Sequence, residues 1–228
     1  MRALSTHRAA LGWAVFCAAA CLALAVLVTS VEAVAAWDTG VVLALNPVVV
    51  GNPALRFAAT VATTVGSPAS VDILTVVAIV IAWLRCAAAK VGRVWAAGYL
   101  AAARLVELGL DTGMKNVVDR PRPTVPHPLA VATDASFPSG HTAGTAVLCV
   151  SVLLLVHAAG PRPVRTLPIA IAAVVIASVA ASRVLLGVHY PTDVLGGALL
   201  GTATALALVP LLAVGVPRGP TSTPRADR

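Results

Sequence analysis

The residues best suited to chemistry in this chain lie in one short stretch, 182–193, between two long apolar segments. This stretch contains a guanidinium, an imidazole and a carboxylate, in Arg183, His189 and Asp193. Such groups are costly beside hydrocarbon unless they pair or take part in chemistry. A carboxylate four residues after a histidine can hold one ring nitrogen and leave the other free to attack. We therefore expect His189 to be a nucleophile for phosphorus that Asp193 orients; a histidine that merely lies at the membrane interface is the alternative.

Two further polar clusters precede this stretch in the chain. Lys115 and Arg122 belong to the first, with Arg120 between them, and Ser139 and Gly140 belong to the second, at the start of an apolar segment. Guanidinium groups match phosphate oxygens two at a time, and an ammonium adds a point charge. The N–H groups at a helix start bind anions, and glycine lets a ligand approach the backbone closely. The residues expected around a phosphate are Lys115, Arg122, Ser139, Gly140 and Arg183, with Arg120 as a further candidate that could instead bind lipid headgroups.

The second cluster also contains His141, which is available to protonate a departing oxygen. That role contributes roughly 10²- to 10⁴-fold in rate. The three clusters together offer cations, backbone N–H groups, two imidazoles and one carboxylate, without the group of carboxylates that Mg²⁺ prefers. Phosphoryl transfer needs mainly positioning and charge neutralisation. The sequence therefore predicts a phosphate site that uses no metal and no other cofactor.

Three motifs in matching order resemble the signature of the type 2 phosphatidic acid phosphatase superfamily. They are Lys115-x6-Arg122-Pro123, Pro138-Ser-Gly-His141 and Ser182-Arg183-x5-His189-x3-Asp193. The resemblance covers about residues 10–215, and it implies metal-independent dephosphorylation through a phosphohistidine on His189. It also implies His141 as the general acid and Asp193 as the orienting residue. Vanadate-dependent haloperoxidases of the same superfamily are soluble, so the apolar segments of this chain argue against that branch.

The composition is that of an integral membrane protein. Of 228 residues, 59% are hydrophobic and only 11% are charged, and the mean hydropathy is +0.93. A soluble domain of this size needs no such excess of apolar residues. The net charge of +7 comes mostly from Lys and Arg at the termini or between apolar runs, which is typical of a topology signal. Nucleic-acid binding is therefore disfavoured.

The apolar runs predict an all-α fold with six transmembrane helices in a bundle. The expected spans are 10–36, 68–84, a third that ends at Met114, 141–159, 166–186 and 192–216. Trp37 is expected to close the first span, and cleavage of that span as a signal peptide is a minor alternative. A short amphipathic piece is expected at 55–65, lying at the interface, and a polar loop at 115–140. The expected organisation is thus a cytoplasmic N-terminus at 1–9, a membrane domain at 10–216 and a disordered cytoplasmic tail at 217–228.

The third span is the least apolar, because it contains Arg104, Glu107 and Asp111 at spacings that share one helix face. We favour a structural row of ion pairs over a direct role in the active site, since charges in a membrane helix first need partners. Gly197 and Gly201, in the last span, are expected to allow close helix packing.

The charge distribution predicts which side of the membrane each segment faces. With the N-terminus inside, ten basic residues lie on the cytoplasmic side: Arg2, Arg8, Arg85, Lys90, Arg93, Arg162, Arg165, Arg218, Arg225 and Arg228. Five lie outside, and four of these belong to the polar clusters: Arg56, Lys115, Arg120, Arg122 and Arg183. The excess of positive charge inside predicts cytoplasmic termini and an active site at the outer face of the cell membrane.

A phosphate site at the headgroup level fits a lipid whose tails stay in hydrocarbon. The expected function is a lipid phosphate phosphatase acting on phosphatidic acid, phosphatidylglycerol phosphate or a polyprenyl diphosphate. A phosphotransferase that passes the phosphoryl group to another lipid is one alternative. A non-enzymatic lipid transporter or binding protein is the other, and it would need no nucleophile.

Overall fold

The computed structural model describes residues 2–85, 92–159 and 166–214, which form helices joined by loops and contain no strand. The helices are α1 (Arg2–Ser30), α2 (Glu32–Val50), α3 (Pro53–Val65), α4 (Pro68–Arg85), α5 (Arg93–Val118), α6 (Gly140–Ala159), α7 (Thr166–Leu185), α8 (Pro191–Ala207) and α9 (Val209–Val214). The predicted all-α class is confirmed. The predicted tail at 217–228 lies outside the described residues.

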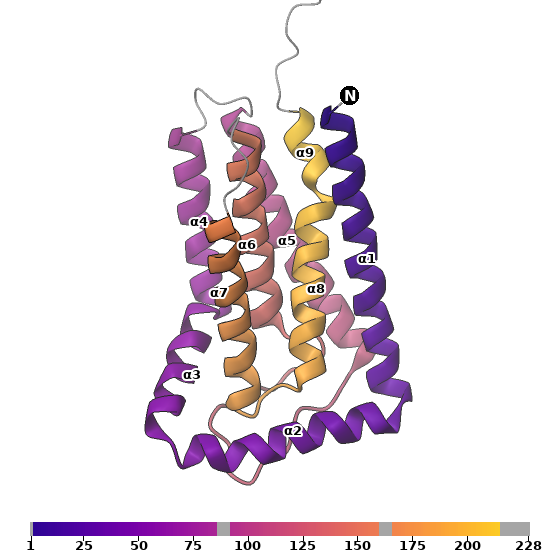
Figure 1. Ribbon diagram of the computed structural model, residues 1–228, viewed down its shortest axis with the longest axis vertical. Coiled ribbons are helices and arrows are strands. Elements are labelled where there is room, and N and C mark those ends of the chain that lie inside the picture. Colours follow the sequence, from indigo (N-terminus) through magenta and orange to yellow (C-terminus); the bar gives the residue numbers. More distant parts are fainter. Residues whose placement is uncertain (1, 86–91, 160–165, 215–228) are drawn as a thin grey trace, which may run out of the picture.

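The helices form an upright bundle closed at one end by a transverse helix (Figure 1). Helices α1, α4, α5, α6, α7 and α8 run along the long axis, and α9 continues α8. Helix α2 crosses the lower end, and α3 lies at the lower edge beside α7. The start of α1 and the end of α9 both lie at the upper end, opposite α2.

The prediction of one span over 10–36 is wrong, because α1 ends at Ser30 and α2 begins at Glu32. Val31 between them has an extended backbone, with φ −118° and ψ 102°. Trp37 therefore lies inside α2, where its side chain is exposed, and does not close the first span. Helix α2 turns aside because it has a face to bury: Asp38, Val42, Asn46 and Val49, spaced by three or four residues, are all buried. Residues 33–36 are as apolar as the end of α1, so the hydropathy of the sequence gives no sign of the turn at Val31.

Within the described residues, six helical segments are long and apolar enough to cross a membrane by length and composition. The set differs from the predicted one, because it includes α2 and omits α5. Helix α5 is too polar to be counted among these apolar helices, since Arg104, Glu107 and Asp111 lie along it. In Figure 1, however, α5 runs upright among the other long helices whereas α2 lies across their ends. The arrangement is therefore a six-helix bundle in which the polar helix α5 lies along the others.

The ends of two segments differ from the prediction, and a third segment agrees with it. Helix α5 continues to Val118, so Lys115 lies in its last turn and not in the following loop. The helix stops at Asp119, which takes the left-handed conformation with φ 43°. The predicted last span is broken at Leu208, since Pro210 has no N–H to continue the helical bonds. The interfacial piece predicted at 55–65 is confirmed as a helix, α3, which Asn52 caps by accepting from the Leu55 N–H at 3.0 Å.

Helices α6 and α8 approach each other closely, as expected from the glycines of the last span. A Cβ atom at Gly197 would overlap the carbonyl oxygen of Ser139, and one at Gly201 would overlap that of Ala143. Only a residue without a side chain fits at these contacts, so the two glycines let the backbone of α8 lie against the start of α6.

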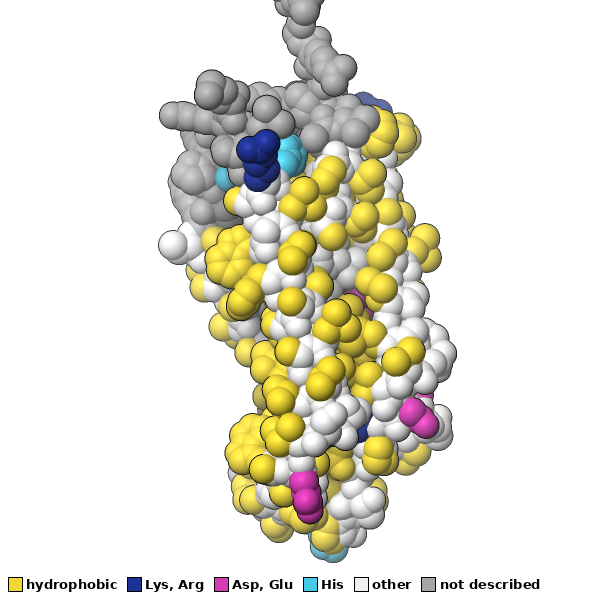
Figure 2. Space-filling model, turned by 90° about the vertical axis from the view of Figure 1, so that its right-hand side faces the viewer, with side chains coloured by type: hydrophobic (Ala, Val, Ile, Leu, Met, Phe, Trp, Pro, Cys, Tyr) yellow, Lys and Arg dark blue, Asp and Glu magenta, His cyan; other side chains and the backbone are white. Residues whose placement is uncertain are grey.

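The flank of the bundle is covered by hydrophobic side chains (Figure 2). Large apolar residues of α1, α4 and α7 that point outward are exposed, among them Phe16, Ile73 and Val174. The acidic side chains that stand out on this face lie towards its lower end. An outer surface of this kind suits a helix bundle surrounded by lipid.

Candidate active site

His189 lies in the short connection between α7 and α8, at the lower end of the bundle. The chain turns there at Gly187, whose φ of 73° is left-handed, and the carbonyl oxygen of Arg183 accepts from the N–H groups of Val188 and His189. The imidazole is 2% exposed. Its Nδ1 lies 2.8 Å from the carbonyl oxygen of Ser136 and 3.5 Å from Oδ2 of Asp193. Since both oxygens only accept, Nδ1 carries the proton and Nε2 keeps its lone pair.

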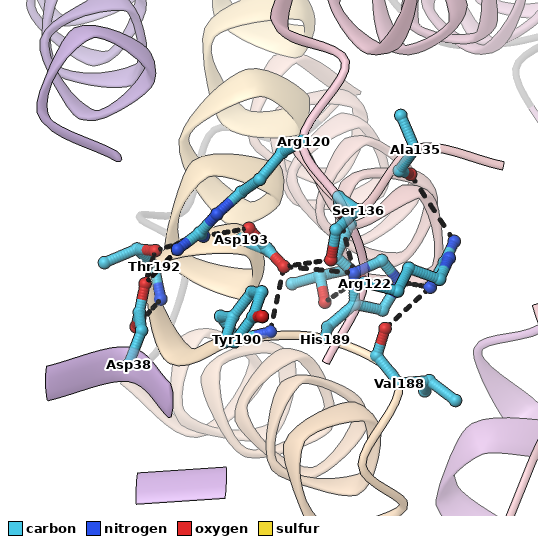
Figure 3. Close-up of polar contacts among 12 residues, drawn as sticks. Asp38, Arg120, Arg122, Ala135, Ser136, Val188, His189, Tyr190, Thr192 and Asp193 are labelled. Carbon is cyan, nitrogen blue, oxygen red and sulfur yellow. Dashed lines mark hydrogen bonds and ion pairs between the residues drawn. The ribbon is translucent and has the colours of Figure 1, made fainter. Parts of the chain in front are cut away.

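The free nitrogen of His189 faces a cation. Its Nε2 lies 3.1 Å from Nη1 of Arg122, which also donates to the carbonyl oxygen of Val188 at 2.7 Å (Figure 3). Burial lowers the pKa of His189 to about 4, although the hydrogen bond and charge of Asp193 act in the opposite direction. The imidazole is therefore neutral at pH 7, which is the form that a nucleophile needs.

Asp193 is completely buried and accepts several short hydrogen bonds. Its carboxylate accepts from the hydroxyl of Ser136 and from Nη1 of Arg120, both at 2.5 Å, and from the N–H of Tyr190 at 2.8 Å. Figure 3 shows these contacts converging on the start of α8. Asp193 thus ties the Ser136 loop to α8, and Ser136 in turn offers its carbonyl oxygen to His189.

Arg120 does not line the phosphate pocket described below. It donates to Thr192 at 2.9 Å and to Asp193, and its Nη2 lies 2.7 Å from Oδ2 of Asp38 in α2. The guanidinium lies 4.1 Å from the centre of the Tyr190 ring. Asp38 also accepts from the N–H and the hydroxyl of Thr192. The candidate role of Arg120 in phosphate binding therefore has no support from its position, which joins α2 to α8.

A pocket of about 210 Å³ opens beside His189, room for several water molecules at about 30 Å³ each. Of the predicted site residues, six line it: Lys115, Arg122, Gly140, His141, Arg183 and His189. Ser139 does not, because it is buried and its N–H donates to the carbonyl oxygen of Asp193 at 3.0 Å. The N–H groups of the first turn of α6 that remain for a ligand are those of Gly140 and His141. The structure thus brings the cations and both imidazoles of the three motifs to one pocket.

The cations of the pocket have partners within the protein. Lys115 lies 2.9 Å from Asp111 and 2.8 Å from Asp134, and Asp134 lies 2.6 Å from Arg122. Partial burial opposes ionisation of Asp134, but the hydrogen bond and charge of Lys115, and then those of Arg122, hold the pKa of Asp134 below its usual range. Arg183 donates to the hydroxyl of Thr63 in α3 at 2.6 Å. The carboxylate of Asp134 thus bridges Lys115 and Arg122, so an anion that entered the pocket would compete with it for these cations.

Asp134, Ser136 and Asp38 are not among the site residues expected from the sequence. Ser136 acts on His189 through its backbone carbonyl, which has no sequence signature. Asp38 is 82 residues from its partner Arg120, so no spacing rule connects them. The position of Asp134 shortly before the Pro138-Ser-Gly-His141 motif is the one sequence feature that could have indicated that it lies near the site.

The polar face of α5 forms the inner wall of the same pocket. Arg104 lies 2.7 Å from Asp72 and also pairs with Glu107, so the expected row of ion pairs is present. Arg104, Glu107 and Asp111 also line the pocket. Among the described residues, no group of three or more His, Cys, Asp or Glu side chains is arranged to hold a metal ion.

Residues 94–214 match the PAP2 superfamily. This match covers more than half of the chain, and the chain belongs to that superfamily. It contains all three polar clusters and the helices that position them, whereas α2 and Asp38 lie outside it.

Two curated relatives match a part of the chain. A decaprenylphosphoryl-5-phosphoribose phosphatase of Mycobacterium tuberculosis is 42% identical over 101 residues, covering 42% of this chain and 49% of the relative. Phosphatidylglycerophosphatase B of Bacillus subtilis is 37% identical over 94 residues, covering 40% of this chain and 46% of the relative. The chain thus spans about half the length of the curated relatives it matches.

The fold resembles a solved structure over most of its length. A transmembrane PAP2 type phosphatidylglycerolphosphate phosphatase from Bacillus subtilis superposes with a TM-score of 0.75 at 26% identity, covering 86% of this chain and 93% of the other. The chain is therefore a membrane protein with the architecture of a transmembrane PAP2 phosphatase.

Proposed function

We propose that the protein is a membrane lipid phosphate phosphatase that works through a phosphohistidine. The observation that carries this proposal is the position of His189, whose unprotonated Nε2 faces a pocket lined by Lys115, Arg122 and Arg183. A neutral imidazole beside three cations is suited to attack a bound phosphate monoester, since the cations neutralise its oxygens. The names of the related phosphatases support a lipid phosphate as the substrate.

The reaction has two steps. In the first, Nε2 of His189 forms a bond to phosphorus while the bond from phosphorus to the ester oxygen breaks, and protonated His141 gives its proton to that oxygen. The positive charge that develops on the imidazole is stabilised by the carbonyl of Ser136 and the carboxylate of Asp193 near Nδ1. In the second step, His141 takes a proton from water as the water oxygen forms a bond to phosphorus and the bond from phosphorus to Nε2 of His189 breaks, which releases inorganic phosphate and restores the lone pair on Nε2.

The other site residues bind and position the substrate. Lys115, Arg122 and Arg183 contact the phosphate oxygens, together with the N–H groups of Gly140 and His141. Ser139 holds the start of α6 against α8, and Arg120 holds Asp193 in place. No metal or other cofactor enters either step.

We also propose that the active site faces the extracytoplasmic side of the cell membrane. The site lies at the α2 end of the bundle, whereas both described chain ends lie at the other end (Figure 1). Arg85 ends α4 and Arg93 begins α5 at that other end, which fits a cytoplasmic surface. Reporter fusions near residues 88 and 130 test this sidedness, because they should report opposite sides of the membrane.

The proposed function is tested by phosphate release from purified protein in detergent. Phosphatidylglycerophosphate, phosphatidic acid and a polyprenyl diphosphate are the substrates, each assayed with EDTA present. Release from at least one of them, lost in His189→Ala, supports the proposal. Transfer of the phosphoryl group to an added lipid acceptor would instead indicate a phosphotransferase. A transporter or binding protein would release no phosphate, and its lipid binding would survive in His189→Ala.

A further inference from the structure

The catalytic pocket continues past the phosphate-binding cations along the polar face of α5. Beyond Lys115, its wall is formed by Asp111, Leu108 and Glu107. These residues follow one another inward along the helix, and Glu107 lies about 6 Å beyond Asp111 at 1.5 Å per residue. Arg104 lines the same stretch and pairs with Glu107, as Lys115 pairs with Asp111. The part of the pocket next to the phosphate site therefore adds two carboxylates to the cations, where a site for phosphate alone would need only cations.

The two carboxylates of this wall each have an oxygen without a partner. Glu107 is 1% exposed and pairs with Arg104 through Oε2, but its Oε1 is buried and accepts no hydrogen bond. Asp111 pairs with Lys115 through Oδ2, and its Oδ1 is likewise buried without a donor. A buried acceptor left unsatisfied costs about 1–3 kcal/mol, and more when it is charged. Two such acceptors one turn apart, in the wall of one pocket, indicate a ligand that donates hydrogen bonds.

The position of Asp111 places this wall directly beside the phosphate. A Cβ atom at Gly140 would lie 3.0 Å from Oδ2 of Asp111 and 3.3 Å from Nζ of Lys115. Gly140 begins α6, and the first N–H groups of this helix point at the proposed phosphate site. Because Asp111 packs against Gly140, its carboxylate lies beside that site. A group that contacts Asp111 is therefore attached close to the phosphate ester.

We propose that Glu107 and Asp111 form a subsite for hydroxyl groups, which selects lipids whose terminal phosphate is carried by a polyol. A hydroxyl can donate to a carboxylate oxygen that has no partner, whereas an ionised phosphate oxygen has no hydrogen to donate there. Glycerol phosphate and ribose phosphate have such hydroxyls beside the phosphate ester. Phosphatidic acid and a polyprenyl diphosphate have none. This inference rests on the proposed function, and it goes further by naming the substrate class.

The names of the two curated relatives fit this class. One acts on a phosphoribose attached to decaprenyl phosphate and the other on a phosphatidylglycerophosphate. Both headgroups place a polyol between the terminal phosphate and the rest of the lipid. The subsite itself is assigned from the buried oxygens of Glu107 and Asp111 in this chain.

The test compares kcat/KM for phosphatidylglycerophosphate and phosphatidic acid in wild type, Glu107→Gln and Asp111→Asn. We expect wild type to prefer the polyol lipid and each variant to lose roughly 10-fold or more of that preference, because the hydroxyl then meets a neutral amide in place of a charged acceptor. Asp72→Asn is the matched control, since Asp72 pairs with Arg104 in the same network but does not line the pocket. Its preference should equal that of wild type.

A second measurement needs no variant. Glycerol 3-phosphate and methyl phosphate should both inhibit wild type by competition, and glycerol 3-phosphate should have the lower inhibition constant by about 10-fold. Equal inhibition by both, or an unchanged preference in both variants, overturns the hydroxyl subsite and leaves the proposed function intact. Failure of wild type to release phosphate from either lipid overturns the proposed function and the subsite with it.

Discussion

The guanidinium of Arg120 lies 2.5 Å from the carboxylate of Asp193 and, through its other terminal nitrogen, 2.7 Å from that of Asp38. All three side chains are buried, and Figure 3 shows them in a row that leads to His189. The transverse helix α2 is thereby linked through Arg120 to the carboxylate that lies beside the imidazole of His189. Because a small displacement of a catalytic group can be costly, the position of α2 should influence the rate.

Asp38→Asn should therefore lower kcat on the order of 10-fold while changing KM little, because Asp193 and His189 lose their fixed position but the phosphate pocket keeps its cations. Thr39→Ala is the matched control, since Thr39 is an exposed neighbour in the same helix. Kinetics at temperatures well below the unfolding transition separate this effect from lost stability. An equal fall in both variants, or a change confined to KM, would show that Asp38 does not position the catalytic groups.

Asp134 should compete with phosphate for the cations of the pocket. Its carboxylate bridges Lys115 and Arg122, so a bound phosphate must displace it. Asp134→Asn should then tighten inhibition by vanadate and inorganic phosphate, by roughly 10-fold if one charged contact of about 1.4 kcal/mol is released. Asp119→Asn, in the same loop, should leave the inhibition constants unchanged. Weaker inhibition in Asp134→Asn would mean instead that Asp134 holds the two cations in place for the substrate.

The pH dependence should reflect the pKa of His189, which burial lowers to about 4. Its nucleophilic form is then lost only below about pH 5, well under the ordinary pKa of about 6.5. The ionisation of the substrate phosphate is titrated separately and its effect on kcat/KM is removed. The log of the corrected kcat/KM should then fall on the acidic side with a pKa near 4, which is the limb assigned to His189. Asp193→Asn should move that limb to lower pH, because Asp193 raises the pKa of His189, and should lower the rate by roughly 10²- to 10⁴-fold. A limb near pH 6.5 in wild type would contradict the buried position of His189.

The same shift affects stability. Since the folded pKa lies below the unfolded one, the unfolded chain binds more protons between the two values. The contribution of His189 to the free energy of unfolding is complete above about pH 6.5 and falls as the pH drops towards 4. In wild type the unfolding temperature should decline over this range more steeply than in His189→Gln, whose side chain does not titrate.

Gly197→Ala should destabilise the bundle and reduce activity. Its Cβ atom would overlap the carbonyl of Ser139 and push on the start of α6, which carries His141. Overpacking of this kind costs typically about 1–3 kcal/mol. Gly98→Ala in α5 is the control, because nothing lies within 4 Å of the added atom there. Thermal unfolding in detergent should place the Gly197 variant below wild type and the Gly98 variant at or above it.

The sequence was most informative where motif spacing coincides with helix ends. The residues of the three motifs meet at one end of the bundle because each motif lies at a helix terminus, and hydropathy sets most helix ends to within a few residues. It was least informative where a polar contact joins distant segments or uses the backbone. Asp38 lies in a helix that hydropathy merges with α1, and Ser136 reaches His189 through a carbonyl group that any residue possesses.

Arg120 shows the corresponding limit for charged residues. Arg120 and Arg122 both belong to the Arg-Pro-Arg-Pro run, and the motif spacing marks only Arg122 as an expected phosphate ligand and leaves Arg120 as a further candidate. Their side chains point to different partners because the chain is extended there, Arg120 towards Asp38 and Asp193 and Arg122 towards Asp134 and His189. The fold then shows that Arg120 joins α2 to α8, whereas Arg122 lines the pocket.

The central claim is tested most directly by trapping the covalent intermediate. Purified protein given a ³²P-labelled lipid phosphate and quenched rapidly in alkali should carry acid-labile label in wild type, and more of it in Asp193→Asn if hydrolysis of the intermediate slows. His189→Gln should carry none, while a filter-binding assay shows that it still takes up the lipid. Acid-labile label that persists in His189→Gln would contradict the account and assign the nucleophile to another residue.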